Sequence, residues 1–146
     1  MRQLTLAVTA LCFFLLPDWG NDLSAALKKA KEENKYVLLN FSGSDWCIPC
    51  IRMHKEIFDS KEFTDLAGEK LVLVNADFPR LKKNKLSKEQ TKKNNDLADR
   101  YNKEGNFPLT LLLDKEGKVV KRWDGYPDMK PAQFADLIKS AIDGGK

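Results

Sequence analysis

The chain has 146 residues, of which 42% are hydrophobic and 32% are charged. This length suits one domain with a buried core, and the composition excludes a disordered chain and a bundle of membrane helices. The formal net charge of +4 is too small to indicate a nucleic-acid partner.

The N-terminal residues resemble an export signal. Arg2 precedes an uncharged, largely apolar run of 13 residues, from Leu4 to Leu16. A membrane span needs about 20 such residues, so this run is better suited to the core of a signal peptide. We therefore expect a signal peptide or N-terminal anchor at residues 1–17 and one domain at residues 18–146. The alternative is that the run forms a first buried strand.

A signal peptide would place the domain outside the cytoplasm, in the bacterial periplasm or tethered to the membrane facing it. Cys12 would leave with the signal, and only Cys47 and Cys50 would remain. Outside the reducing cytosol, this pair can persist as a disulfide.

Helical and strand patterns alternate along the rest of the chain. The run YVLLNF, for example, is nearly continuously apolar, as in a strand that is covered on both faces. The expected helices begin near 21, 47, 87 and 131, the second ending at Gly68, and the expected strands lie at 36–41, 70–77, 108–114 and 118–126. This order predicts an α/β fold, a mixed central sheet flanked by helices on both faces.

The stretch SGSDWCIPC, residues 42–50, places two cysteines where a strand ends and a helix begins. Unpaired N–H groups at a helix start favour a thiolate, and cysteines in this setting have pKa values of about 3.5–7.5, against about 8.5 for a free cysteine. We therefore expect Cys47 to attack a disulfide and Cys50, one turn inward, to resolve the mixed disulfide. Pro49 fits the first helical turn, and Trp46 can offer a flat apolar contact to a substrate.

Two other interpretations of the pair involve no exchange chemistry. Zinc would need two more ligands; His54, the single histidine, lies one turn after Cys50, and the fourth ligand would have to be an acid. A structural disulfide at this spacing would close a tiny loop, which gains least from a cross-link. Redox exchange without a metal or other cofactor is therefore preferred, and His54 is expected to be a surface or helix-packing residue.

With these features the sequence resembles the thioredoxin superfamily, above all its exported thioredoxin-like members. It is also similar to the C-terminal domain of bacterial transmembrane disulfide reductases. The matching segments are KYVLLNFSGSDWCIPC, the strand ending VNAD, and NFPLTLLLDKEGKVVKRWDGY.

The resemblance implies a thioredoxin fold in which Pro108 is a cis proline that faces the cysteine pair. The backbone of Phe107 would then pair with an extended substrate. Leu109 stands where the family usually has threonine, and would make the substrate-facing rim more apolar. The alternative is that Pro108 merely starts an edge strand.

The sequence departs from the family before the motif. Thioredoxins have a buried acid there, which helps to deprotonate the resolving cysteine, and a lysine that accompanies it. The corresponding residues here are expected to be Asn40 and Leu73. Because Asn40 cannot accept a proton, Cys50 must pass its proton to water or to another group, and Asp45 is the nearest candidate in sequence.

A second departure is the basic, partly helical insertion at about 80–103, which contains nine Lys or Arg and three Asp or Glu residues. It can be a solvated helix face, or a docking surface for an acidic partner or an anionic membrane surface. Nucleic acid is not expected, because stacking aromatic residues are sparse in this segment.

The sequence therefore predicts an extracytoplasmic thiol–disulfide oxidoreductase that acts on protein thiols and disulfides as a monomer. A proline beside the second cysteine resembles reductases, and reduction in an oxidising compartment requires an electron donor. We therefore favour a reductase of protein disulfides that is supplied by a membrane-embedded donor. The alternatives are a disulfide isomerase or oxidant, and a non-catalytic thioredoxin-fold protein that binds clients.

Overall fold

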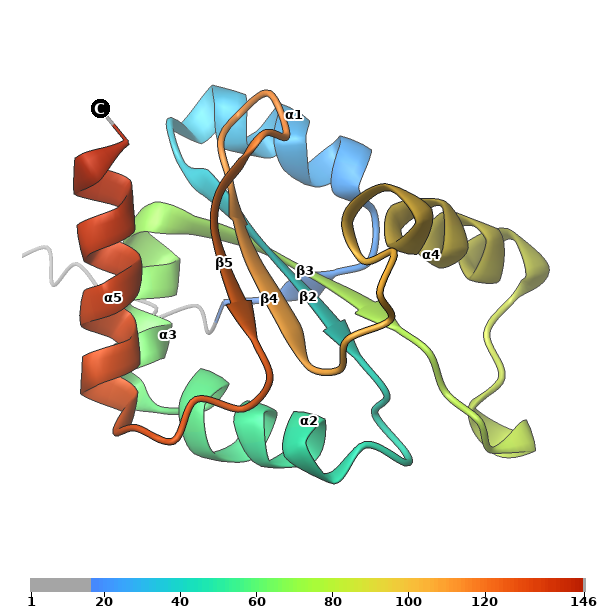
Figure 1. Ribbon diagram of the computed structural model, residues 1–146. Coiled ribbons are helices and arrows are strands. Elements are labelled where there is room, and N and C mark those ends of the chain that lie inside the picture. Colours follow the sequence, from blue (N-terminus) through green and yellow to red (C-terminus); the bar gives the residue numbers. More distant parts are fainter. Residues whose placement is uncertain (1–16, 146) are drawn as a thin grey trace, which may run out of the picture.

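The computed structural model describes residues 17–145, so nearly all of the expected signal peptide, with Cys12, lies outside the described residues. Five strands form one mixed sheet in the order β1-β3-β2-β4-β5 (Figure 1). Strands β1, β2 and β3 are parallel, β4 is antiparallel to β2, and β5 is antiparallel to β4. The strands are β1 (Trp19–Gly20), β2 (Tyr36–Ser42), β3 (Leu71–Asp77), β4 (Leu109–Leu113) and β5 (Val119–Asp124).

Helices cover both faces of this sheet, which confirms the predicted α/β class. Figure 1 shows α3 and α5 side by side on one face and α1 and α4 on the other. The helices are α1 (Leu23–Glu33), α2 (Ile48–Met53), α3 (Lys61–Lys70), α4 (Lys88–Tyr101) and α5 (Pro131–Gly144). A π-helical turn, η1 (His54–Phe58), continues α2, and a 3₁₀ turn, η2 (Lys82–Asn84), precedes α4.

The structure adds the short strand β1, which the sequence did not predict, and several element boundaries differ from the prediction by one or two residues. The helix expected to end at Gly68 continues to Lys70, so β3 begins one residue later than expected. Gly68 is tolerated within α3, where it lies on the exposed side. Within residues 17–145, no helix is both long and apolar enough to cross a membrane.

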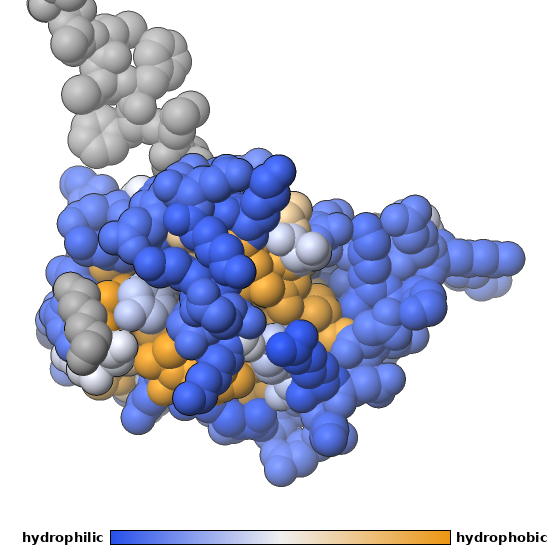
Figure 2. All heavy atoms as spheres, turned by 90° about the horizontal axis from the view of Figure 1, so that it is seen from above, coloured by the Kyte–Doolittle hydropathy of each residue, from blue (hydrophilic) through white to orange (hydrophobic). Residues whose placement is uncertain are grey.

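The central strand β2 contributes to two cores because its side chains alternate between the faces of the sheet. Leu38 packs with Phe58, Phe63 and other residues beneath α3 and α5, whereas Val37 and Leu39 pack on the opposite face beneath α1. Seen from the side of α1, the surface is mainly hydrophilic, and apolar atoms appear only in patches between charged side chains (Figure 2). Burial on both faces explains why β2 is almost uninterruptedly apolar.

Candidate active site

The two cysteines lie at the start of α2, just after β2 ends. Cys47 is the N-cap of this helix, and Pro49 lies in its first turn. The Sγ atom of Cys47 is disulfide-bonded to Cys50 and accepts the backbone N–H of Cys50 at 3.3 Å. Only 5% of Cys47 and 1% of Cys50 is exposed. An N–H group directed at a sulfur stabilises the thiolate that forms when the disulfide is reduced.

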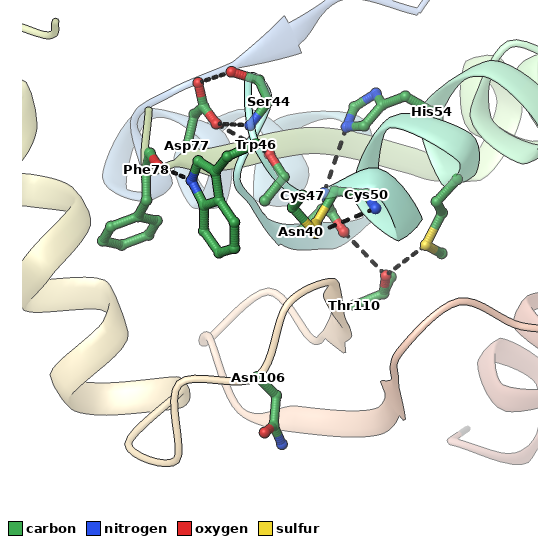
Figure 3. The surroundings of a disulfide bond; sticks show 12 residues. Asn40, Ser44, Trp46, Cys47, Cys50, His54, Asp77, Phe78, Asn106 and Thr110 are labelled. Carbon is green, nitrogen blue, oxygen red and sulfur yellow. Dashed lines mark hydrogen bonds between the residues drawn. A yellow bond between two sulfur atoms is a disulfide. The ribbon is translucent and has the colours of Figure 1, made fainter. Parts of the chain in front are cut away.

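Trp46 forms a fixed wall beside the pair. Its indole N–H donates a 2.7 Å hydrogen bond to the carbonyl oxygen of Phe78 (Figure 3). The guanidinium of Arg80 lies 3.6 Å from the centre of the Trp46 ring, and the Phe107 ring meets it edge-on at 5.6 Å. The indole is therefore held by three contacts from other segments, and one of its neighbours is Phe107.

Asp45 anchors the start of the basic segment and does not face Cys50. Its carboxylate accepts hydrogen bonds from the backbone N–H groups of Arg80 at 2.9 Å and Leu81 at 3.0 Å, and from the Asn84 amide at 2.9 Å. The hydrogen bond from Arg80, followed by that from Asn84, holds the pKa of this carboxyl below its usual value. The carboxylate of Asp45 is therefore engaged with the start of the basic segment.

A second carboxylate, that of Asp77 at the end of β3, holds the loop before the cysteines. It accepts the Ser44 backbone N–H at 2.8 Å and the hydroxyl groups of Ser42 and Ser44 (Figure 3). Sequence reasoning missed this role, although a carboxylate at the carboxyl end of a strand beside the motif strand is a recognisable signal.

Behind the cysteines, Asn40 is fully buried at the centre of a polar network. Its amide nitrogen donates to Asn75 Oδ1 at 3.1 Å, and its amide oxygen accepts from Thr110 Oγ1 at 3.1 Å. Asn75 is the residue beside Asn40 in the β2–β3 register, whereas the buried Leu73 pairs with Leu38. Asn75, and not Leu73, therefore lies beside Asn40.

His54 extends this network towards a pocket. Its Nε2 atom lies 3.5 Å from the Asn40 amide nitrogen (Figure 3). Its ring packs against Trp19 and Phe58. Burial lowers the pKa of His54, and the charges of Asp59 and Asp77 partly oppose this effect. His54 thus packs on a helix as expected, but it also lines, together with Cys50, a pocket of about 210 Å³. Among residues 17–145, no three side chains of His, Cys, Asp or Glu are clustered like metal ligands.

The loop before β4 brings Phe107 and Pro108 to the end of β2 from which the motif starts. Their peptide bond is cis, and the next residue, Leu109, pairs with Phe41 in the β2–β4 register. Within residues 17–145, neither the backbone N–H nor the backbone C=O of Phe107 forms a hydrogen bond. Both groups are therefore available to an incoming peptide.

Leu109 does not contribute to the substrate-facing rim. Its side chain is 0% exposed and belongs to the core beneath α1 and α4, so that expectation was wrong. All five residues of β4 are buried because helices cover both faces of the sheet, and Leu109 lies on the face covered by α1 and α4. The apolar side chains exposed beside the cysteines are instead Ile48, which is 66% exposed, and Ile51.

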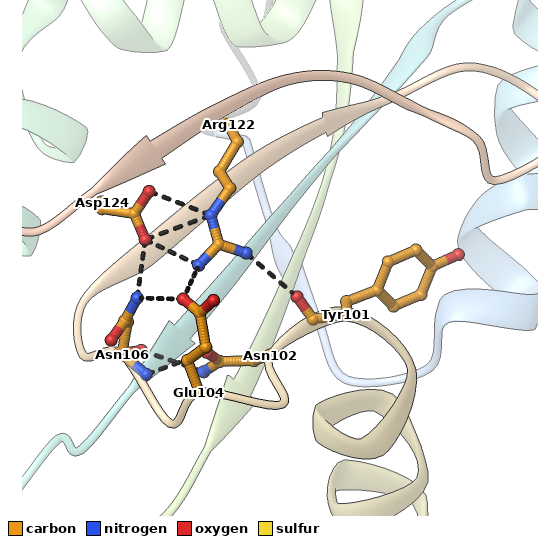
Figure 4. A network of polar contacts seen from close by, with 6 residues as sticks. All are labelled: Tyr101, Asn102, Glu104, Asn106, Arg122 and Asp124. Carbon is orange, nitrogen blue, oxygen red and sulfur yellow. Dashed lines mark hydrogen bonds and ion pairs between the residues drawn. The ribbon is translucent and has the colours of Figure 1, made fainter.

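A second polar network fixes the loop that carries Phe107. Arg122 binds Asp124 and Glu104, and Asp124 also accepts the Asn106 amide at 2.8 Å (Figure 4). The buried Asn102 side chain exchanges two 2.9 Å hydrogen bonds with the backbone of Asn106. The residue before Phe107 is thus held by contacts to its side chain and to its backbone.

The basic segment forms a groove beside Trp46. A pocket of about 340 Å³ lies between the chain after β3 and α4. Its apolar lining comes from Phe78, Pro79, Leu81 and Leu86, and its basic rim from Arg80, Lys82 and Lys85. Two lysines of α4 are instead engaged in ion pairs, because Lys92 pairs with Asp96, and Lys93 pairs with Asp22 and Glu89.

Comparisons with known proteins agree with this geometry. Residues 23–142 match the thioredoxin-like domain family. Over 117 residues, 80% of this chain and 68% of the relative, the sequence is 39% identical to the disulfide bond reductase DsbH of Chlamydia pneumoniae. It is 29% identical over 125 residues to the thioredoxin-related protein DsbJ of the same organism, of which it spans 35%.

Two solved structures show how far the likeness extends. The chain superposes on a DsbH oxidoreductase with a TM-score of 0.81 and 34% identity, covering 97% of this chain and 95% of the other. The oxidised C-terminal domain of DsbD from Neisseria meningitidis gives a TM-score of 0.58 at 20% identity, over 85% and 99% of the two chains. The second match reflects the fold alone.

Proposed function

The chain belongs to the thioredoxin-like domain family and is a thiol–disulfide oxidoreductase, and we propose that it works outside the cytoplasm as a reductase of protein disulfides. The observation that carries this proposal is the disulfide of Cys47 and Cys50 at the start of α2, with an N–H group directed at the Cys47 sulfur. The relative that is 39% identical bears the name of a disulfide bond reductase, which supports this direction.

In the proposed reaction, the Cys47 thiolate of the reduced protein attacks one sulfur of a client disulfide. A Cys47–client bond forms, and the other client sulfur leaves as a thiolate. Cys50 then loses its proton, and its sulfur attacks Cys47. The Cys47–Cys50 disulfide forms, the second client thiolate leaves, and the client has gained two electrons.

The client would bind across the rim made by the loop before β4 and the start of α2. The free backbone groups of Phe107 would pair with an extended client segment, as strands pair in a sheet. Trp46 and Ile48 would supply apolar contact. We assign Pro108 to holding Phe107 in place and Pro49 to beginning the helix.

Each turnover leaves the protein oxidised, so an oxidising compartment requires a source of electrons. We propose a membrane-embedded donor, because the apolar N-terminal run fits an export signal or anchor. No second chain is required for the site, since every residue assigned to it comes from this chain, and we propose that the protein acts as a monomer.

The reduction potential of the Cys47–Cys50 pair tests the direction of exchange. The protein is equilibrated with glutathione and with a stronger dithiol, and a Cys50→Ser variant serves as the control without a pair. A potential near that of thioredoxin, about −270 mV, is expected. A potential of about −120 to −180 mV would instead assign the protein to the oxidants or isomerases.

We also propose that the groove beside Trp46 binds an acidic segment of a partner protein. Its apolar floor suits one apolar side chain, and its basic rim suits neighbouring carboxylates. Among the described residues, no carboxylate forms an ion pair with Lys82 or Lys85, so both charges are available. The groove also adjoins the redox site, because Arg80 stacks on Trp46.

Charge reversal tests this docking surface. The Lys82→Glu/Lys85→Glu variant should lower kcat/KM about tenfold for a disulfide peptide with acidic flanks, but not for one with neutral flanks. The matched control is Lys28→Glu/Lys31→Glu, which reverses two exposed charges on α1. If the Lys82→Glu/Lys85→Glu variant changes kcat/KM equally for both peptides, the acidic partner is refuted. It is also refuted if the wild type binds anionic lipid vesicles and only this variant, not the control, loses that binding.

A further inference from the structure

The second step of the proposed reaction depends on a proton that Cys50 must lose. Cys50 is only 1% exposed, and burial disfavours the thiolate of a cysteine. The group directly behind it, Asn40, is an amide that cannot accept a proton. Asp45 is bound to the chain at Arg80 and Asn84. The proton must therefore pass to water or to a group other than Asn40.

His54 lies where such a group is needed. It is one helical turn after Cys50, and its backbone N–H bonds to the Cys50 carbonyl oxygen. Both residues line the same pocket of about 210 Å³, which is roomy enough for water to connect the thiol and the imidazole. The pocket also contains Lys55 and Asp59, but an ammonium group accepts no proton and a carboxylate is a far weaker base than imidazole.

The contact with Asn40 selects the basic form of the imidazole. The Asn40 amide oxygen accepts from Thr110, so its amide nitrogen is the group that lies 3.5 Å from His54 Nε2. An amide nitrogen can only donate, so Nε2 must be the unprotonated, accepting nitrogen. A charged imidazolium would place two donors against each other here. The contact therefore favours the neutral imidazole between turnovers, and it is lost when Nε2 takes up the proton.

Burial and the surrounding charges shift the pKa of His54 in opposite directions. Burial lowers the pKa of His54, whereas Asp59, after η1, and Asp77, at the end of β3, raise it. Lys55 lies beside His54 at the pocket. From β2, the neutral Asn40 contacts this ring, and the neutral Ser42 lines the same pocket.

We propose that His54 is the proton acceptor for Cys50, working through water in the pocket that both residues line. This inference rests on the proposed roles of Cys47 and Cys50. The Cys50 thiol gives its proton to the neutral imidazole, and the resulting thiolate attacks Cys47 and expels the client thiolate. The imidazolium then returns the proton to the departing thiolate or to solvent, so His54 is neutral again after each turnover.

Stopped-flow reaction of the reduced protein with the aromatic disulfide DTNB separates the two steps. Attack by Cys47 releases one coloured thiolate, and resolution by Cys50 releases the second, without any client protein. A Cys50→Ser variant identifies the first phase. General-base catalysis contributes about 10²–10⁴-fold, so His54→Gln should slow the second phase at least about a hundredfold at pH 6 and leave the first phase unchanged.

The pH profile distinguishes proton transfer from support of the fold. In the wild type, the second phase should be nearly constant above the lowered pKa of His54. In His54→Gln it should rise about tenfold per pH unit until Cys50 ionises by itself. Lys55→Gln, which changes the same pocket, should behave like the wild type. In His54→Ala, added imidazole should restore the second phase in proportion to its unprotonated fraction.

Two results would overturn the inference. A second phase in His54→Gln with the rate and pH profile of the wild type would show that His54 accepts no proton. An equal loss in both phases would show that it only supports the helix. Reduction of insulin disulfides is measured separately, so a wild type that shows both DTNB phases but leaves insulin oxidised would count against the proposed function alone.

Discussion

Gly43, at the start of the motif loop, is the position where one added methyl group should do most damage to the site. A Cβ atom there would lie 2.2 Å from Cε2 of Trp46 and 2.4 Å from its Nε1. Since carbon atoms pack at about 3.5–4.0 Å, the indole must move by more than 1 Å in Gly43→Ala. This movement would break the 2.7 Å hydrogen bond to Phe78 and unstack Arg80.

The cost of Gly43→Ala follows from these contacts. Overpacking typically costs about 1–3 kcal/mol, and a lost hydrogen bond about 1 kcal/mol. We therefore expect the free energy of unfolding to fall by about 2–3 kcal/mol. For a domain of this size, that corresponds to a fall in Tm of about 10 °C.

Denaturant unfolding of the oxidised protein, followed by tryptophan emission, measures this loss. Gly68→Ala is the matched control, because a Cβ atom at Gly68, within α3, meets nothing within 4 Å. Alanine is a better helix former than glycine by about 1 kcal/mol, so the control should be as stable as the wild type or more so. If Gly43→Ala unfolds at the same denaturant concentration as the wild type, Trp46 is not a fixed wall and the reasoning fails.

Three further predictions concern acid stability, the mixed disulfide and the attachment of α4. Because the pKa of His54 is lowered on folding, the unfolded chain binds the proton more tightly than the folded chain. The free energy of unfolding should therefore fall as the pH drops below about 6.5 and level off below the folded pKa, with a total loss of about 1.4 kcal/mol per unit by which the pKa is lowered. Denaturant unfolding of His54→Gln should lack this pH dependence. Cys50→Ala should accumulate client mixed disulfides through Cys47 on non-reducing gels, and the double variant Cys47→Ala/Cys50→Ala should form none. Asn94 is buried and donates to the Asp77 carbonyl at 2.8 Å, so Asn94→Ala should lose about 1–3 kcal/mol of unfolding free energy in the same assay.

The fold could be predicted from the sequence because its signals are local. The apolar run of β2, the helix start at Cys47 and the turn before β5 each depend on neighbouring residues, and their order specifies a mixed sheet covered on both faces. The helix end was misjudged because Gly68 is a common stop signal, but here α3 continues to the start of β3. Local patterns therefore gave the longer elements, but they missed the short strand β1 and the boundaries that packing decides.

The surroundings of the cysteines were less predictable because they depend on register. Asn75 lies beside Asn40 through a pairing between parallel strands whose relative shift is not readable from either strand alone. Leu109 is turned inward by the same kind of constraint, from its pairing with Phe41. Asp45 is close to Cys47 in sequence, yet its carboxylate binds a segment more than thirty residues away.

The amide at position 40 and the histidine at position 54 are best understood together. A carboxylate at position 40 would be a base itself, but it would also accept a hydrogen bond from the imidazole N–H and favour the charged, non-accepting form of His54. The Asn40 amide cannot do this, because its donor faces Nε2 and its acceptor is occupied by Thr110. Replacing the buried acid with an amide thus removes one proton acceptor and, in the same step, keeps the neighbouring imidazole neutral. The redox pair can therefore lack the usual acid and still have a base within one helical turn of Cys50.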